Sequence, residues 1–209
     1  MAPRLQPRRK GRKSMFIVRL RERLMSVVFA FAAMLLLSSC APESPPPERH
    51  FTTRDLLIGL SEMPDGWTGC LEQSADYLST QDSATMAFEA DTTMSPRVAR
   101  HRVYRYRSAQ AARGVYQDIV TPGQVGKTPA EWTYQSSIAD QSFFTCYDYE
   151  GRVPYPVCEW SARYEEYVVI FHSWLIPGYM SLEDMERVVR AIDARMAHYL
   201  GKPLPTQEP

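Results

Sequence analysis

An apolar segment of fourteen residues, Leu24 to Leu37, limits what the start of this chain can become. A helix that crosses the hydrocarbon core of a bilayer needs about 20 apolar residues, so the segment is too short to span one. Residues 1–23 carry nine Lys and Arg against a single acidic residue, Glu22. A basic start followed by a short apolar segment is typical of an export signal. We therefore expect residues 1–39 to be a signal peptide that is removed.

The end of the apolar segment, Leu37-Ser38-Ser39-Cys40, resembles the lipobox of bacterial lipoproteins. The resemblance implies that the chain is cut before Cys40 and that its sulfur receives a diacylglyceryl group. Two acyl chains hold a protein on a bilayer, whereas one chain alone binds only marginally. The expected location is the cell membrane, with the protein lipid-anchored on the extracytoplasmic face, either at the outer surface or in the periplasm.

The remaining 170 residues suit one domain with a substantial core. Residues 40–51 are rich in proline and form a linker after the lipidated cysteine, because such sequences favour extended polyproline structure. We expect a single domain over residues 52–201 and a disordered polar tail over 202–209.

The net charge of the exported part is acidic, although the whole chain is balanced. Residues 40–209 hold 15 Lys and Arg and 23 Asp and Glu, because nine of the 24 basic residues and one of the 24 acidic residues precede them. A surface of this charge argues against nucleic acid as a partner.

The order of apolar patterns predicts an α+β domain, a twisted antiparallel β-sheet with three helices packed mainly on one face. Helices are expected from Thr52 or Thr53 to about Met63, after Ser108 over 109–120, and between Ser181 and Gly201. Strands are expected at 67–71, 84–90, 98–107, 132–138, 142–149, 157–163 and 167–175.

The first expected helix is followed by Met63-Pro64-Asp65-Gly66-Trp67. This lead-in resembles that of exported bacterial domains, some of which are similar to the sensor domains of receptor kinases. The resemblance covers about fifteen residues and implies a sensor-like α+β domain.

Export places the cysteines that follow Cys40 in an oxidising compartment. Cys146 and Cys158 flank an expected turn near Arg152, so they can face each other across a hairpin and form a disulfide. Pairing of Cys70 with either of them remains open from the sequence.

A basic run and an aromatic cluster supply the candidate binding residues. On a strand, Arg105 and Arg107 share a face with His101, and Arg100 and Arg102 lie opposite. We expect most of these arginines to be solvated or paired with nearby glutamates, and the alternative is an anion-binding patch. Aromatic residues crowd the last hairpins, where they suit either a sheet face or a ligand cleft. The candidate ligand-binding residues are Arg105, Arg107, Tyr147 and Trp160.

Catalytic and metal-binding patterns are lacking in the sequence. The four histidines lack metal-ligand spacing, so no metal is expected. No Gly-x-Ser-x-Gly elbow is present, and Gly123 to Thr128 lacks the first glycine of a phosphate-binding loop. We therefore expect no cofactor and no enzyme activity.

Two functions remain beside a third, an unrecognised hydrolase, which would need a buried polar triad near Cys70 or a serine. The first is a membrane-anchored extracytoplasmic lipoprotein whose sensor-like domain binds an unknown small molecule or protein without catalysis. The alternative is a structural or assembly accessory protein of the cell envelope that docks through its sheet face. A pocket lined by tyrosine and tryptophan favours the first, and a flat exposed apolar patch favours the second.

Overall fold

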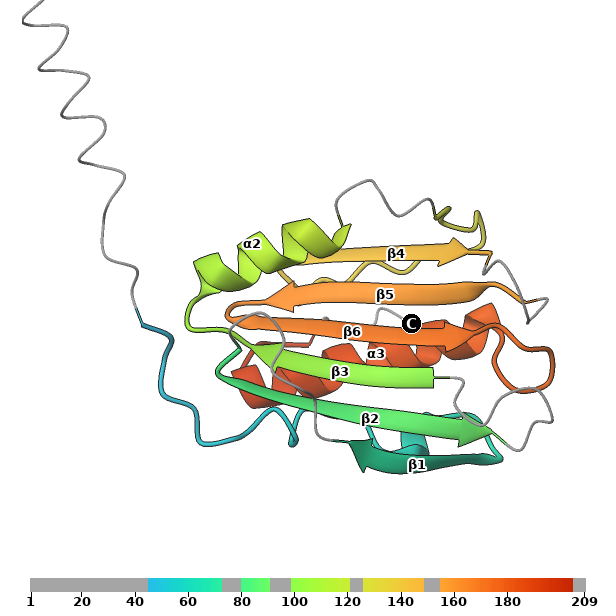
Figure 1. Ribbon diagram of the computed structural model, residues 1–209, viewed down its shortest axis with the longest axis horizontal. Helices are drawn as coiled ribbons and strands as arrows, with labels where there is room; N and C mark the ends of the chain where they lie inside the picture. The colour runs from blue at the N-terminus through green and yellow to red at the C-terminus, as the bar shows by residue number, and fades with distance from the viewer. Residues whose placement is uncertain (1–44, 73–79, 91–98, 121–125, 149–154, 205–209) are drawn as a thin grey trace, which may run out of the picture. The chain divides into compact units, whose positions relative to one another are not determined.

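Antiparallel pairing joins six strands of the described residues into one sheet, in the order β1-β2-β3-β6-β5-β4 (Figure 1). The computed structural model describes residues 45–72, 80–90, 99–120, 126–148 and 155–204, which belong to one compact unit. The strands are β1 (Trp67–Glu72), β2 (Asp82–Ala90), β3 (Ala99–Arg105), β4 (Gln141–Tyr147), β5 (Val157–Tyr164) and β6 (Tyr167–Trp174). The predicted α+β class and antiparallel sheet are confirmed.

Helix α3 (Leu182–Leu200) covers one face of this sheet. It begins at Ser181, whose hydroxyl accepts a hydrogen bond from the N–H of Asp184 at 3.0 Å, as the capping-box pattern predicts. It ends at Gly201, whose φ of 66° is readily adopted by glycine.

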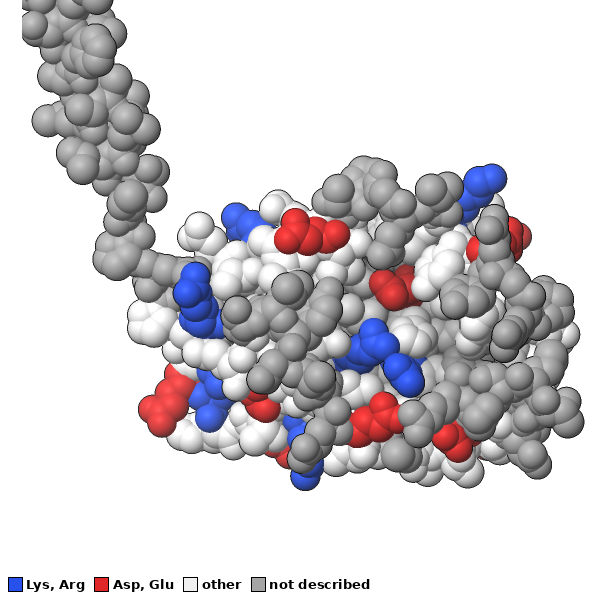
Figure 2. Space-filling view, in the orientation of Figure 1, with Lys and Arg blue, Asp and Glu red and all other residues white. Residues whose placement is uncertain are grey.

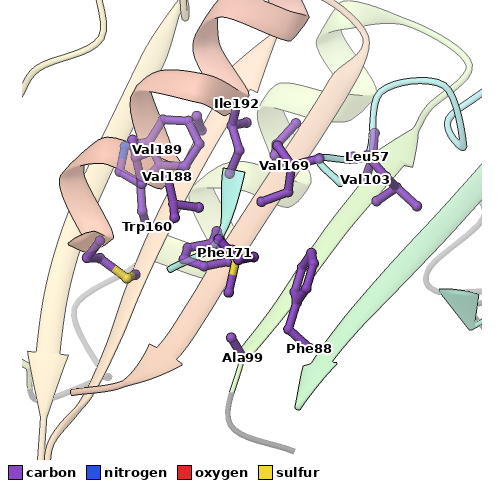
Figure 3. Packing of buried hydrophobic residues seen from close by; sticks show 14 of the residues in the cluster. Leu57, Phe88, Ala99, Val103, Trp160, Val169, Phe171, Val188, Val189 and Ile192 are labelled. Carbon is purple, nitrogen blue, oxygen red and sulfur yellow. The ribbon is translucent and has the colours of Figure 1, made fainter. Parts of the chain in front are cut away.

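The core lies between α3 and the sheet. Figure 3 shows Val188, Val189 and Ile192 of the helix turned toward Trp160 and Phe171 of the sheet. All five side chains are at most 1 % exposed. Burying a large apolar side chain of this kind contributes roughly 1.5–3 kcal/mol, so this layer is the main source of stability.

Helix α2 (Ala109–Val120) lies on the opposite face of the sheet (Figure 1). Its buried residues Ala112 and Tyr116 pack in a second cluster with Tyr104, Val168 and Ile170. The prediction that the helices pack mainly on one face is therefore wrong. It fails because an amphipathic pattern shows that a helix buries one stripe, without showing which face of the sheet receives it.

The predicted helix from Thr52 to Met63 is also wrong. The chain makes turns over residues 53–57 and a short 3-10 segment, η1 (Leu60–Glu62). Only half of a capping box forms: Asp55 Oδ2 accepts a hydrogen bond from the N–H of Thr52 at 2.8 Å, and the hydroxyl of Thr52 donates to the same carboxylate at 2.9 Å. The helix does not continue because the N–H of Ile58 donates to His101 Nδ1 of β3 at 3.2 Å instead of to a carbonyl one turn earlier.

No strand forms at 132–138, contrary to prediction, although this segment is fully described. The hydroxyl of Ser136 accepts hydrogen bonds from the N–H groups of Ile138 and Ala139, at 3.2 and 2.9 Å. This local turn removes the donors that a strand would need. Residues 126–140 instead form an irregular covering segment beside β4 and α3.

Candidate functional site

The four candidate ligand-binding residues do not converge. In the strand register Arg105 lies opposite Tyr167, the first residue of β6, whereas Tyr147 lies opposite Val157, which pairs with the last residue of β6. Trp160 is 1 % exposed and belongs to the core, and Arg107 lies on the surface after β3. Arg105 and Tyr147 therefore lie at opposite ends of the sheet.

Arg105 belongs to an ion-pair group with the start of the domain. Glu166 is 1 % exposed, and its Oε1 lies 3.5 Å from Arg105 Nη2 and 3.0 Å from Arg49 Nε. Arg49 also donates to Glu165, in the turn between β5 and β6. The glutamates that the sequence offers as partners for the basic run thus bind Arg105 and Arg49.

The end of the predicted linker contacts the same part of the domain. The ring of Phe51 stacks on Tyr167, with 6.1 Å between centroids, and lies 5.1 Å from the ring of Tyr199. In the predicted tail, Lys202 Nζ donates to the carbonyl of Ile138 at 3.2 Å. The first and last described segments, which contain Phe51 and Lys202, therefore make specific contacts with the folded domain.

Cys146 and Cys158 form the predicted disulfide. They lie directly opposite each other on β4 and β5, twelve residues apart in sequence. Closing a loop of this size removes entropy from the unfolded chain and stabilises the fold by on the order of 3 kcal/mol.

A group that the sequence analysis missed lies between α3 and the covering segment. Asp193 of α3 is 2 % exposed, and its carboxylate accepts hydrogen bonds from the hydroxyls of Tyr134 and Tyr164. Burial, then the hydrogen bond from the hydroxyl to Asp193, raises the pKa of Tyr134 above its usual value. Burial and the negative charge of Asp193 raise the pKa of Tyr164. Both phenols therefore stay protonated at neutral pH and hold the carboxylate as donors.

A pocket of about 530 Å³ opens beside this group. Its lining residues come from the covering segment, the outer side of α3 and the chain after it: Thr133, Tyr134, Gln135, Ser137, Ile138, Arg190, Asp193, Ala194 and Leu204. The guanidinium of Arg190 lies 4.2 Å from the centroid of the Tyr134 ring, a distance that allows a cation–π contact. The volume lies within the range of roughly 300–1,000 Å³ found for small-ligand sites.

The covering segment is positioned by contacts with β4. Gly126 precedes Lys127, which exchanges two backbone hydrogen bonds with Cys146 at 2.8 and 2.9 Å. Farther along, the ring of Trp132 stacks on Phe144 with centroids 3.6 Å apart. A second hollow, of about 210 Å³, lies beside these rings and shares Thr133, Tyr134 and Gln135 with the first.

One sequence signal could have identified this region. The apolar stripe of α3 contains one acidic residue, Asp193, next to Ile192 and four residues after Val189. A carboxylate on a core-facing stripe needs buried donors, and tyrosines in the preceding irregular segment can supply them.

The described residues contain no group of three or more His, Cys, Asp and Glu arranged to hold a metal ion. Within the same residues, no helix has the length and hydropathy to cross a membrane. No family model, curated protein or solved structure matches the chain.

Proposed function

We propose that this protein is a membrane-anchored extracytoplasmic lipoprotein whose α+β domain binds a small ligand or partner without catalysing a reaction. The lipobox residues Leu37 to Cys40, after a basic start and a short apolar segment, support the anchor. Residue Cys40 carries the lipid, and the domain faces away from the cytoplasm. The disulfide between Cys146 and Cys158 agrees with an oxidising compartment.

The observation that carries the binding role is the pocket beside α3. It combines an aromatic wall, Tyr134, with polar groups from Thr133, Gln135 and Ser137 and with the cationic Arg190. A few polar groups in a hollow of this volume orient a ligand. Asp193 is already bound by two phenols, so it is occupied as a structural acceptor and does not act as a general base.

Docking through an apolar sheet face is less well supported. The large apolar residues that are exposed among those described are Leu60, Leu71, Phe143 and Leu204. Leu71 on β1 and Phe143 on β4 lie on opposite edge strands of the sheet, so the four do not form one patch. A docking surface between envelope proteins needs a contiguous apolar area of several hundred Å².

The anchor is tested by growing cells that express the full chain with an alkyne analogue of palmitate. We expect the protein to be labelled and to sediment with membranes, and Cys40→Ala to abolish both. The control is Cys70→Ala, which keeps Cys40 and the disulfide pair. An unlabelled wild-type protein in the soluble fraction would contradict the anchor.

The pocket is tested separately with Ala194→Trp, which fills the hollow from the surface of α3. Native mass spectrometry of protein purified from its membranes should find a bound small molecule on the wild type and none on the variant. Ala191→Trp, on the same helix but outside the pocket, is the matched control. The same bound mass on Ala194→Trp would place the ligand elsewhere.

A further inference from the structure

The sheet face opposite α3 is only partly covered by α2. The strand register places two neighbouring rows of side chains on this face, the first at the edge of the α2 cluster and the second beyond it. One row runs from Arg102 to Ile170 and Ser161 across β3, β6 and β5, and the next runs from Arg100 to His172 and Glu159. Tyr116 of α2 reaches only as far as the first row, where its hydroxyl lies 3.5 Å from the carbonyl of Ser161.

Arg100 and Arg102 therefore lie side by side on this face, two residues apart on a central strand, with about 7 Å between their Cα atoms. Both are half-buried, and neither guanidinium makes a hydrogen bond or ion pair with another described residue. Figure 2 shows basic groups over β3 and β6 near the middle of the face, with acidic groups on either side.

The other partly or fully buried arginines of the domain are paired. Arg163 is 6 % exposed and lies 2.8 Å from Asp140 Oδ2, and Arg49 and Arg105 share Glu166. Two half-buried guanidiniums next to each other repel, and they lose hydration without a direct hydrogen bond or ion pair to a described residue. A fold that holds them there is stabilised when an anion neutralises them.

Acidic residues flank the pair on this face, Glu89 of β2 on one side and Glu159 of β5 on the other. Glu159 Oε1 accepts a hydrogen bond from the hydroxyl of Ser161 at 3.2 Å. Burial raises the pKa of Glu159, and this hydrogen bond and the charge of Arg102 act against the rise. His172, which lies between Glu159 and Arg100 in the row, adds no positive charge at neutral pH. Burial, followed by the charges of Arg102 and Arg100, lowers its pKa to about 4.

We propose that Arg100 and Arg102 form a binding site for an oxyanion, the phosphate or carboxylate group of a ligand, on the part of this sheet face that α2 does not cover. Guanidinium groups fit such an anion because their N–H groups contact two oxygens at once. His172 is a neutral neighbour that can donate a further hydrogen bond. This site is separate from the pocket beside α3 and does not depend on the lipid anchor.

The test is isothermal titration calorimetry of the purified full chain with inorganic phosphate and with acetate, at constant ionic strength in chloride. Arg100→Gln and Arg102→Gln should each weaken binding at least tenfold. Arg113→Gln removes the same charge from the exposed side of α2 and should leave binding unchanged. Preference for phosphate over acetate would identify a phosphoryl ligand, and the reverse preference a carboxylate.

A second measurement needs no variant. An anion between the two guanidiniums offsets their charge, so the pKa of His172 should rise when phosphate or acetate binds, as followed by NMR of the imidazole protons. Absence of binding at concentrations on the order of 10 mM would overturn the proposal. Equal binding by wild type and the two glutamine variants would also overturn it, as would a His172 signal that neither anion moves.

Discussion

Tyr164 on β5 donates a hydrogen bond to Asp193 on α3, and both side chains are at most 2 % exposed. Tyr134 donates to the other oxygen of the same carboxylate and connects the covering segment to the core. A hydrogen bond to a charged group contributes about 1.5–3 kcal/mol, so Tyr134→Phe and Tyr164→Phe should each lower the unfolding free energy by an amount of this order. Urea denaturation followed by circular dichroism measures the change.

The matched control for these two changes is Tyr155→Phe. Tyr155 is half-buried against the same core, and its hydroxyl has no hydrogen-bond partner among the described residues. Equal losses for all three variants would show that the carboxylate of Asp193 is not the reason for the effect.

Acid should destabilise the fold because two imidazoles are buried in the neutral form. Burial lowers the pKa of His101 to about 3, and burial with the two neighbouring arginines lowers that of His172 to about 4. Above about pH 6.5 both histidines are neutral in the folded and in the unfolded chain. They therefore add no pH dependence to the unfolding free energy in that range. As the pH falls below 6.5 the unfolded chain takes up protons first, and each histidine lowers stability by roughly 1.4 kcal/mol per pH unit until its folded pKa is reached.

Urea titrations between pH 7.5 and 4.5 measure this slope. His101→Gln keeps an acceptor for the N–H of Ile58 but cannot titrate in this range, so its slope should be smaller by the contribution of one histidine. The exposed His198→Gln keeps both buried imidazoles and serves as the control. An unchanged slope in His101→Gln would mean that His101 does not stay neutral in the fold.

The ion pairs of Arg49 should make the end of the linker part of the stable domain. Removing one partner from a buried pair costs roughly 3–5 kcal/mol when the other stays charged and buried, as Glu166 does here. Arg49 is 13 % exposed, and Arg105 still contacts Glu166 when Arg49 is replaced. We therefore expect Arg49→Ala to lower the unfolding free energy by an amount at or below the lower end of that range. Thermal unfolding measures the loss, with Arg113→Ala, a change at an exposed arginine, as the control. Limited proteolysis should cut Arg49→Ala faster than the wild type near residue 49.

Two glycines should respond in opposite directions to replacement by alanine. A Cβ on Gly126 would lie 1.9 Å from Thr145 Oγ1 and 3.1 Å from the carbonyl oxygen of Cys146, so the covering segment would have to move away from β4. We expect Gly126→Ala to destabilise by about 1–3 kcal/mol, the usual effect of overpacking. Gly114 lies on α2 with nothing within 4 Å of a Cβ, so Gly114→Ala should stabilise by about 0.5–1 kcal/mol. Chemical denaturation of both variants checks the two signs.

The sequence predicts the regular elements with clear caps or alternation. Helix α3 follows from its apolar stripe between Ser181 and Gly201, and α2 from the stripe after Ser108, whose hydroxyl accepts from the N–H of Ala111 at 3.0 Å. The strands were found within a few residues because their apolar alternation reflects a buried face.

The failures come from contacts between distant parts of the chain. The predicted helix after Thr52 has half of a capping box, but His101, 43 residues away, takes the N–H of Ile58 and no helix forms. The pocket could not be predicted because Tyr134 was assigned to a strand, whereas it lies in an irregular segment and bonds to Asp193, 59 residues later. The division of the basic run between two faces is confirmed for the residues on β3, whereas Arg107 lies after the strand. No local pattern shows that Glu166 pairs with Arg105.

The contacts of Arg49 and Phe51 have a consequence for the proposed anchor. With lipid on Cys40, only the six residues 41–46 lie between the lipidated residue and Pro47, whose carbonyl accepts a hydrogen bond from Arg105 Nη2 at 2.8 Å. At about 3.1 Å per residue, a stalk of six residues in polyproline structure would reach roughly 19 Å. Because the stalk leaves the domain beside the β5–β6 turn, that turn should be the membrane-proximal pole, and any soluble ligand would approach from the sides or the distal pole.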